Sequence, residues 1–130
     1  VELIVIHHTH NNKNFDEIKQ DHLKRGFEDI GYHFLIDKKG KLIKGRDEKF
    51  IGAHVLGFNK NSLGIALIGN FDKEKPTSKQ IESLINFLKL RLKQHNLNLN
   101  SIKGHNFFNK NKSCPGKNLN VREIIKKVKG

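Results

Sequence analysis

The most informative stretch for the fold is Leu3-Ile-Val-Ile-His-His8, in which four apolar residues are followed at once by two histidines. A short run rich in branched apolar side chains is typical of a strand buried on both faces of a sheet. Ser62 to Gly69 contains a second run of this kind, and Ile102 to Gly104 is a shorter candidate. We therefore expect three strands, the first ending at His7 and His8.

Three helices are predicted around these strands. Phe15 to Phe27 has apolar residues at mixed spacings of three and four and closes near Gly26. Thr77 stands three residues before Gln80, which predicts a capping box. The apolar stripe that follows predicts a helix face packed on the core: Ile81, Leu84, Ile85, Leu88 and Leu92. Leu119 to Val128 predicts a last helix with lysines near its carboxyl end.

One hairpin completes the pattern. Tyr32 to Asp37 and Leu42 to Lys44 flank a glycine-containing turn and predict two paired strands. Gly45 to Lys60 and Asn106 to Gly116 are expected to be irregular. Strands that alternate with helices, together with a hairpin, predict a mixed α/β fold in which helices flank a central mixed β-sheet. With no repeat and no linker, residues 1–130 are expected to form a single domain.

Length and composition exclude several classes of protein. With 130 residues, 35% of them hydrophobic, the chain can form a stable buried core without disulfide bonds. Its only cysteine, Cys114, excludes an intramolecular disulfide and a four-cysteine zinc module. No apolar run approaches the ~18 residues that a membrane span needs, so none is expected. An export signal would lie upstream of Val1, and the compartment is left open.

The charge is strongly positive: 25 Lys and Arg against 13 Asp and Glu give +12. Such an excess favours a polyanionic partner, which could be nucleic acid, an anionic membrane face or an acidic cell-wall polymer. An alternative is that AT-rich codon usage produced the crowded lysines and asparagines. Nucleic acid is not expected as a partner, since the chain has no Lys/Arg run of five, one tyrosine, and no recognisable reader motif.

Histidine is abundant, with eight in the chain. Histidines at strand ends are the informative ones, because the sheet holds them rigidly while their tips reach a shared edge. His7 and His105 occupy such positions, and Cys114 follows His105 after a loop long enough to fold back. Two histidines and one thiolate match the three protein ligands of a catalytic zinc site whose fourth position is open.

Alternatives remain open at this point. A lone cysteine is commonly a small buried apolar residue rather than a ligand. Neighbouring strand residues point to opposite faces, so only one of His7 and His8 can reach a given site, and the apolar pattern does not say which. His10, His22 and His95 lie in polar stretches and are expected at the surface.

Seven segments, in one order from about residue 3 to residue 125, resemble a known family. They are Val5-Ile-His-His-Thr9, Gly31-Tyr-His-Phe34, Gly45-Arg-Asp-Glu48, Gly52-Ala-His54, Asn59-Lys-Asn-Ser-Leu-Gly64, Gly104-His105 and Lys112-Ser-Cys-Pro-Gly116. The chain resembles the zinc-dependent N-acetylmuramoyl-L-alanine amidases of the second type, a group that includes the amidase-type phage lysozymes and the peptidoglycan recognition proteins. The fold of this family, a central mixed sheet with flanking helices, agrees with the pattern above.

The resemblance implies one catalytic zinc ion with His7, His105 and Cys114 as ligands, which selects His7 over His8. Tyr32 matches a tyrosine that supports catalysis beside the metal, and Lys112 matches the catalytic lysine of the phage-lysozyme branch. Without the resemblance, Tyr32 would be interpreted as a packing aromatic and Lys112 as an ordinary loop lysine.

Two further histidines, His33 and His54, match positions in the substrate-binding groove or behind the ligands. The implied activity is hydrolysis of the amide between N-acetylmuramic acid and L-alanine, with peptidoglycan as partner and the bacterial cell wall as the place of action. A monomer is expected. The biological setting is left open between phage lysis, as in an endolysin, and wall remodelling, as in an autolysin, with recycling or antibacterial attack also open.

Two other functions compete with this one. The first is a peptidoglycan-binding module of the same fold without catalysis; such members typically lack the cysteine ligand, which is present here as Cys114. The second is a basic nucleic-acid-binding domain, which leaves the histidines, the cysteine and the ordered motifs without an explanation.

Overall fold

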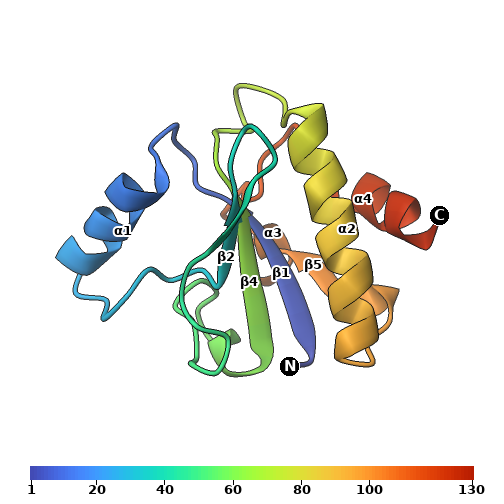
Figure 1. The fold of residues 1–130 in the computed structure, drawn as a ribbon, viewed down its shortest axis with the longest axis horizontal. Coiled ribbons are helices and arrows are strands. Elements are labelled where there is room, and N and C mark those ends of the chain that lie inside the picture. The colour runs from blue at the N-terminus through green and yellow to red at the C-terminus, as the bar shows by residue number, and fades with distance from the viewer.

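A five-stranded sheet forms the centre of the computed structural model, which describes residues 1–130 (Figure 1). Its strands are β1 (Leu3–His8), β2 (Phe34–Ile36), β3 (Leu42–Lys44), β4 (Ser62–Leu67) and β5 (Ile102–Gly104). They lie in the order β3-β2-β4-β1-β5. Only the β2–β3 hairpin is antiparallel, while β1 pairs in parallel with β4 and β5, and β2 with β4. The predicted mixed sheet is therefore confirmed.

The helices are α1 (Phe15–Lys24), α2 (Ser78–Gln94), the short α3 (His105–Phe108) and α4 (Val121–Lys129). Single 3₁₀ turns, Asn59–Asn61 and Leu99–Ser101, precede β4 and β5. The predicted capping box is confirmed, since the Gln80 amide donates to Thr77 Oγ1 at 3.1 Å and the Thr77 amide donates to Gln80 Oε1 at 3.0 Å. No helix is both long and apolar enough to cross a membrane.

The segment Asn106 to Gly116 was expected to be irregular throughout, and this expectation was wrong at its start. His105 begins α3 directly after β5, so the chain turns into one helical turn before the loop that leads to Cys114. One turn buries too little apolar surface to leave a periodic signal in the sequence. The helix matters because it places His105 beside the end of β1.

Apolar residues cover both faces of the sheet, as the two unbroken strand runs predict. The larger cluster lies between the sheet and the helices α2 and α4, and includes Ile4 and Ile6 of β1. The smaller one lies on the α1 side, where Ile18 packs near Leu35 and Ala66. Because side chains alternate along a strand, the two faces receive alternate residues of β1.

His22 was expected at the surface, and this expectation was wrong. Its side chain is buried, and the Gly31 amide donates to His22 Nδ1 at 2.9 Å. The polar residues around it in the sequence lie on the outer side of α1, while His22 shares the inner side with Ile18. His10 is exposed as expected, and His95, at the carboxyl end of α2, is half-buried.

The buried His22 predicts a loss of stability in acid. Burial is the largest cause that lowers its pKa from the usual 6.5, and the nearby Arg25 adds to it. As the pH drops below about 6.5, the unfolded chain takes up a proton on this residue before the folded chain does. The free energy of unfolding therefore decreases as the pH is lowered, by at most ~1.4 kcal/mol per pH unit for this residue.

We expect His22→Gln, which offers an amide oxygen to Gly31 and does not titrate, to show a shallower loss. The measurement is denaturant unfolding between pH 7 and pH 5 in the presence of a chelator. Equal slopes for the two proteins would contradict the prediction.

Candidate metal centre

Three segments that are distant in the sequence meet at one edge of the sheet. His7 is the penultimate residue of β1, His105 follows β5 directly, and Cys114 lies in the loop after α3. Since β1 and β5 are parallel neighbours, their carboxyl ends lie at the same edge. One ligand atom from each residue can be chosen so that all three lie within 4.8 Å of one another. The sheet thus brings together all three residues that the resemblance proposes as ligands.

The two neighbouring histidines point to opposite faces of the sheet. His8 lies on the side of Ile4 and Ile6, where its Nδ1 accepts a hydrogen bond from the Phe71 amide at 3.1 Å. His7 lies on the opposite side, with its ring centroid 4.7 Å from that of His105. The geometry therefore selects His7 as the member of the cluster, which the sequence pattern alone did not do.

Burial keeps the cluster uncharged. It is the largest cause that lowers the pKa of His7, with His54 and His105 adding to the effect, and it also lowers the pKa of His105. Burial raises the pKa of the Cys114 thiol to about 12. Neutral imidazole is the form that binds a metal, whereas the thiol must lose its proton when a metal binds.

His54 connects His7 to the sheet behind it. Its Nδ1 lies 2.9 Å from His7 Nε2, and its Nε2 lies 3.2 Å from Ser62 Oγ. The other nitrogen of His7, Nδ1, lies 3.6 Å from Cys114 Sγ and so faces the cluster. If Nδ1 binds a metal, Nε2 carries the proton and donates a hydrogen bond to His54 Nδ1, and the protonated His54 Nε2 then donates a hydrogen bond to Ser62 Oγ. Such a partner fixes the ring and tautomer of a metal-bound histidine.

Two glycines make room for the His54 ring. A Cβ atom at Gly64 would lie 2.6 Å from the ring, and one at Gly52 would lie 2.7 Å from it. Such distances are too short for any side chain. Ser62 and Gly64 were not predicted as parts of the site, although the segment Asn59 to Gly64 carries them among the family-like motifs.

His33 is buried, and both of its ring nitrogens bond to the backbone. Its Nε2 lies 2.9 Å from the Phe50 carbonyl oxygen, and the Gly64 amide donates to its Nδ1 at 3.0 Å. The ring therefore carries its proton on Nε2 and joins the loop at Phe50 to β4. This arrangement supports the position of His54 from behind, since the two rings lie 5.7 Å apart.

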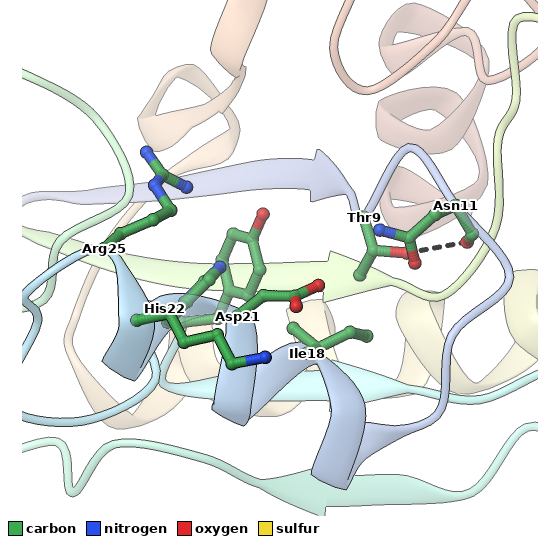
Figure 2. A pocket seen from close by; sticks show the side chains of 8 residues that line it. Thr9, Asn11, Ile18, Asp21, His22 and Arg25 are labelled. Atoms are coloured by element: carbon green, nitrogen blue, oxygen red, sulfur yellow. Dashed lines mark hydrogen bonds between the residues drawn. The ribbon is translucent and has the colours of Figure 1, made fainter.

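Tyr32 lies between the cluster and a cavity under α1. Its ring is 5.2 Å from that of His7 and 5.4 Å from that of His22. The cavity has a volume of about 430 Å³, and Figure 2 shows Asp21 and His22 of α1, with Arg25 directly after the helix, along one side of it and Thr9 and Asn11 on another. Burial raises the pKa of Tyr32 well above its usual range, so the phenol keeps its proton near neutral pH.

Lys112 approaches the cluster from the exposed side. Its charge helps to lower the pKa of both His105 and Cys114, although in each case burial has the larger effect on the pKa. The backbone of the loop holds it there, because the Lys112 amide donates to the Asn109 carbonyl at 3.0 Å. A free ammonium group thus lies near the thiol and imidazole.

A second group of metal-binding residue types, His8, His10 and Asp72, lies behind the centre. Because His8 Nδ1 accepts from the Phe71 amide, the neutral ring carries its proton on Nε2 and has no free lone pair for a metal. Asp72 already accepts a hydrogen bond from Ser113 at 2.6 Å. We infer that this group holds the loop before Cys114 in place, through the hydrogen bond between Asp72 and Ser113.

The class is defined by an open, mostly parallel sheet with two histidines at the carboxyl ends of its strands and a cysteine from the loop after α3 beside them. It is an α/β domain with a candidate three-ligand metal centre. Residues 1–117 match the family described as N-acetylmuramoyl-L-alanine amidase. The chain belongs to this family, as the ordered motifs indicated.

Solved structures agree with this assignment. The fold matches N-acetylmuramoyl-L-alanine amidase LysC from Clostridium intestinale with a TM-score of 0.92 and 37% identity, over 98% of this chain and 85% of that one. It also matches peptidoglycan recognition protein LE in complex with tracheal cytotoxin, with a TM-score of 0.84 and 32% identity, over 95% of this chain and 78% of that one. The predicted fold is confirmed at the level of the family.

Curated relatives fall into the same two groups. A peptidoglycan-recognition protein of Drosophila simulans is 34% identical over 129 residues, which cover 92% of this chain and 70% of the relative. The endolysin of Escherichia phage T7 is 46% identical over 56 residues, which cover 43% of this chain and 37% of the relative. The chain is thus similar both to lytic proteins and to recognition proteins.

The contact between His54 and His7 predicts an effect on metal binding. We expect His54→Ala to weaken zinc binding by about 10- to 100-fold, because His7 loses the partner that orients its ring. Competition against a fluorescent zinc chelator measures the change. His95→Ala, which removes a histidine at the carboxyl end of α2, on the other face of the sheet from His7, is the matched control and should leave affinity unchanged. Unaltered affinity in His54→Ala would show that His7 is oriented by other contacts.

Proposed function

We propose that the protein is a zinc-dependent N-acetylmuramoyl-L-alanine amidase that cleaves the amide bond between N-acetylmuramic acid and L-alanine in peptidoglycan. One observation carries the proposal: in a chain of this family, His7, His105 and Cys114 place their ligand atoms within 4.8 Å of one another. The substrate is a cell-wall polymer, so the bacterial wall is the proposed place of action, and a monomer suffices because one chain supplies the whole cluster.

The donor set fits one zinc ion. Two neutral imidazoles and a thiolate are ligands that zinc prefers, and three protein ligands leave a position open, as in catalytic rather than structural sites. His54 behind His7 supplies the supporting contact that such ligands usually have. When bound, zinc supplies Lewis acidity, which polarises a carbonyl and makes water a nucleophile at neutral pH.

The chain itself supplies two further groups. Tyr32 keeps its proton, so its hydroxyl can donate a hydrogen bond to the substrate carbonyl or orient the attacking water. Lys112 places a positive charge where negative charge develops on the carbonyl oxygen, which stabilises the transition state more than the ground state. The cavity beside Tyr32 would hold the part of the substrate next to the cleaved bond.

Behind these groups, His33 and His54 act as positioning residues in this proposal. Both rings are buried and bonded to the protein, so the contacts they make favour a supporting role over direct contact with the substrate. They hold His7 and the loop at Phe50 in place.

A peptidoglycan-binding module without catalysis is the second candidate. The recognition proteins among the relatives favour it, and one of them is described in complex with a monomeric peptidoglycan fragment. The presence of the Cys114 sulfur 3.6 Å from His7 Nδ1 favours the amidase.

Digestion of purified sacculi, with and without a chelator, distinguishes the two candidates. We expect release of stem peptides that carry a free L-alanine amine, detected by mass spectrometry, and loss of this release when the chelator is present. Binding without release, even with added zinc, would favour the module.

Substitutions separate metal binding from catalysis. Cys114→Ala should lose zinc and activity together, because two imidazoles alone hold the ion weakly. Tyr32→Phe should keep the metal and lose activity, since it removes only the hydroxyl. Metal content and the rate of peptide release are measured on the same samples. Full zinc content and full rate in Cys114→Ala would refute the assignment of the ligand.

Lys112 is tested through the rate of the chemical step. We expect Lys112→Gln to lower kcat on a soluble muropeptide by about a hundred- to a thousandfold with little change in KM, which is typical of a group that stabilises charge in the transition state. Lys110→Gln, two residues earlier in the same loop, is the matched control and should keep its kcat. A loss confined to KM would show that Lys112 binds substrate instead.

A further inference from the structure

A second hollow, which we name the basic groove, lies on the side of β5 that faces α3 and α4. It has a volume of about 780 Å³ and fifteen lining residues. Five of these are cationic and none is acidic: Lys103, Lys110, Lys112, Lys117 and Arg122. In the whole chain, cations outnumber acids by 25 to 13, so the complete absence of acids here is a local feature.

None of the five cations of the basic groove is neutralised within the protein. The structure contains seven ion pairs, and their cationic members lie elsewhere: His10, Lys13, Lys19, Lys38, Lys44, Arg91 and Lys126. Unpaired positive charges that line one concave surface repel one another and raise the local concentration of anions. The basic groove is therefore complementary to an extended anion.

Phe107 contacts two of these lysines through its ring. Its side chain is 52% exposed, and the ammonium groups of Lys103 and Lys110 lie 4.3 Å and 5.2 Å from the centre of its ring. Cation–π contacts of this kind hold a lysine head near an aromatic face. The two ammonium groups are thus kept at the groove instead of moving freely in solvent.

The basic groove and the candidate metal centre share one segment of the chain. The segment from His105 to Cys114 also lines the groove, through Asn106, Lys112 and Ser113. The Asn106 amide donates to the Cys114 carbonyl at 2.8 Å, which closes the loop between the two surfaces. A polymer in the groove would therefore be separated from the proposed reactive site by this one segment.

We propose that the basic groove binds a phosphodiester-linked anionic polymer that is attached to peptidoglycan, and so holds the protein on the wall. Four of the five cations are lysines, which act as point charges and suit single negative charges repeated along a flexible chain. A fixed carboxylate would favour the paired donors of arginine. Only one aromatic residue lines the groove, whereas surfaces for single-stranded nucleic acid stack successive bases on several.

The test measures binding to soluble poly(glycerol phosphate), with zinc present, by fluorescence anisotropy at low salt. We expect Lys103→Gln combined with Lys110→Gln to weaken binding by roughly tenfold and to make it less sensitive to salt, because fewer counterions are released. The matched control, Lys89→Gln with Lys93→Gln, removes two exposed charges from α2 and should change affinity less than about twofold. Sacculi stripped of phosphodiester polymers by acid should retain less of the unaltered protein than native sacculi.

Several outcomes would overturn the proposal. These are no binding of poly(glycerol phosphate), an equal loss in the α2 control, and equal retention on stripped and native sacculi. Tighter binding of a single-stranded oligonucleotide of equal charge, weakened by the groove substitutions, would assign the surface to nucleic acid. Because binding is measured without hydrolysis, failure of the amidase proposal would appear separately, as no release from soluble muropeptide by any form of the protein.

Discussion

The burial of β1 between two parallel strands is the constraint on which the rest of the structure depends. Hydrogen bonds to β4 and β5 fix its register on both sides, and its residues from Ile4 to His8 are buried. A shift of one residue would exchange the two faces and move His7 into the core beside α2. Both the core and the direction of the first candidate ligand therefore follow from one strand, which explains why a histidine pair directly after an apolar run was informative.

Features with a local cause could be predicted from the sequence, and features with a tertiary cause could not. The two interior strands, the hairpin and the capped helix α2 follow from hydrophobic periodicity and capping chemistry. The choice between His7 and His8 did not follow, because both faces of β1 are covered. The burial of His22 depends on α1 packing over the sheet, and the contact between His54 and His7 joins residues 47 positions apart. The resemblance pointed to His54 but could not say what it touches.

The candidate centre concentrates buried histidines without any buried acid to compensate them. Burial is the main cause that lowers the pKa of His7, His54 and His33, and for His54 the value falls to about 3. Protonation of any of them would place unpaired charge in the interior, so the fold tolerates these rings only as neutral groups. That requirement lowers the stability of the fold in acid, where an apolar residue would not. Neutral imidazoles, however, are the form that binds a metal. A local cost of this kind is expected at a functional site rather than in a structural core.

The loop from His105 to Cys114 separates two surfaces of different chemistry. On one side it presents the half-buried imidazole of His105 and thiol of Cys114, and on the other side Lys110 and Phe107, with Lys103 of β5, form a cationic surface. A substrate that is both polymeric and anionic would be attracted by the second surface over a long range, whereas the bond that we propose is cleaved would be recognised only at the first. Since one loop carries both, a polymer held on the exposed side is already positioned near the buried side. Part of the positive excess is then a property of a surface next to the proposed reactive site, because five of the 25 Lys and Arg residues line the basic groove without any acid.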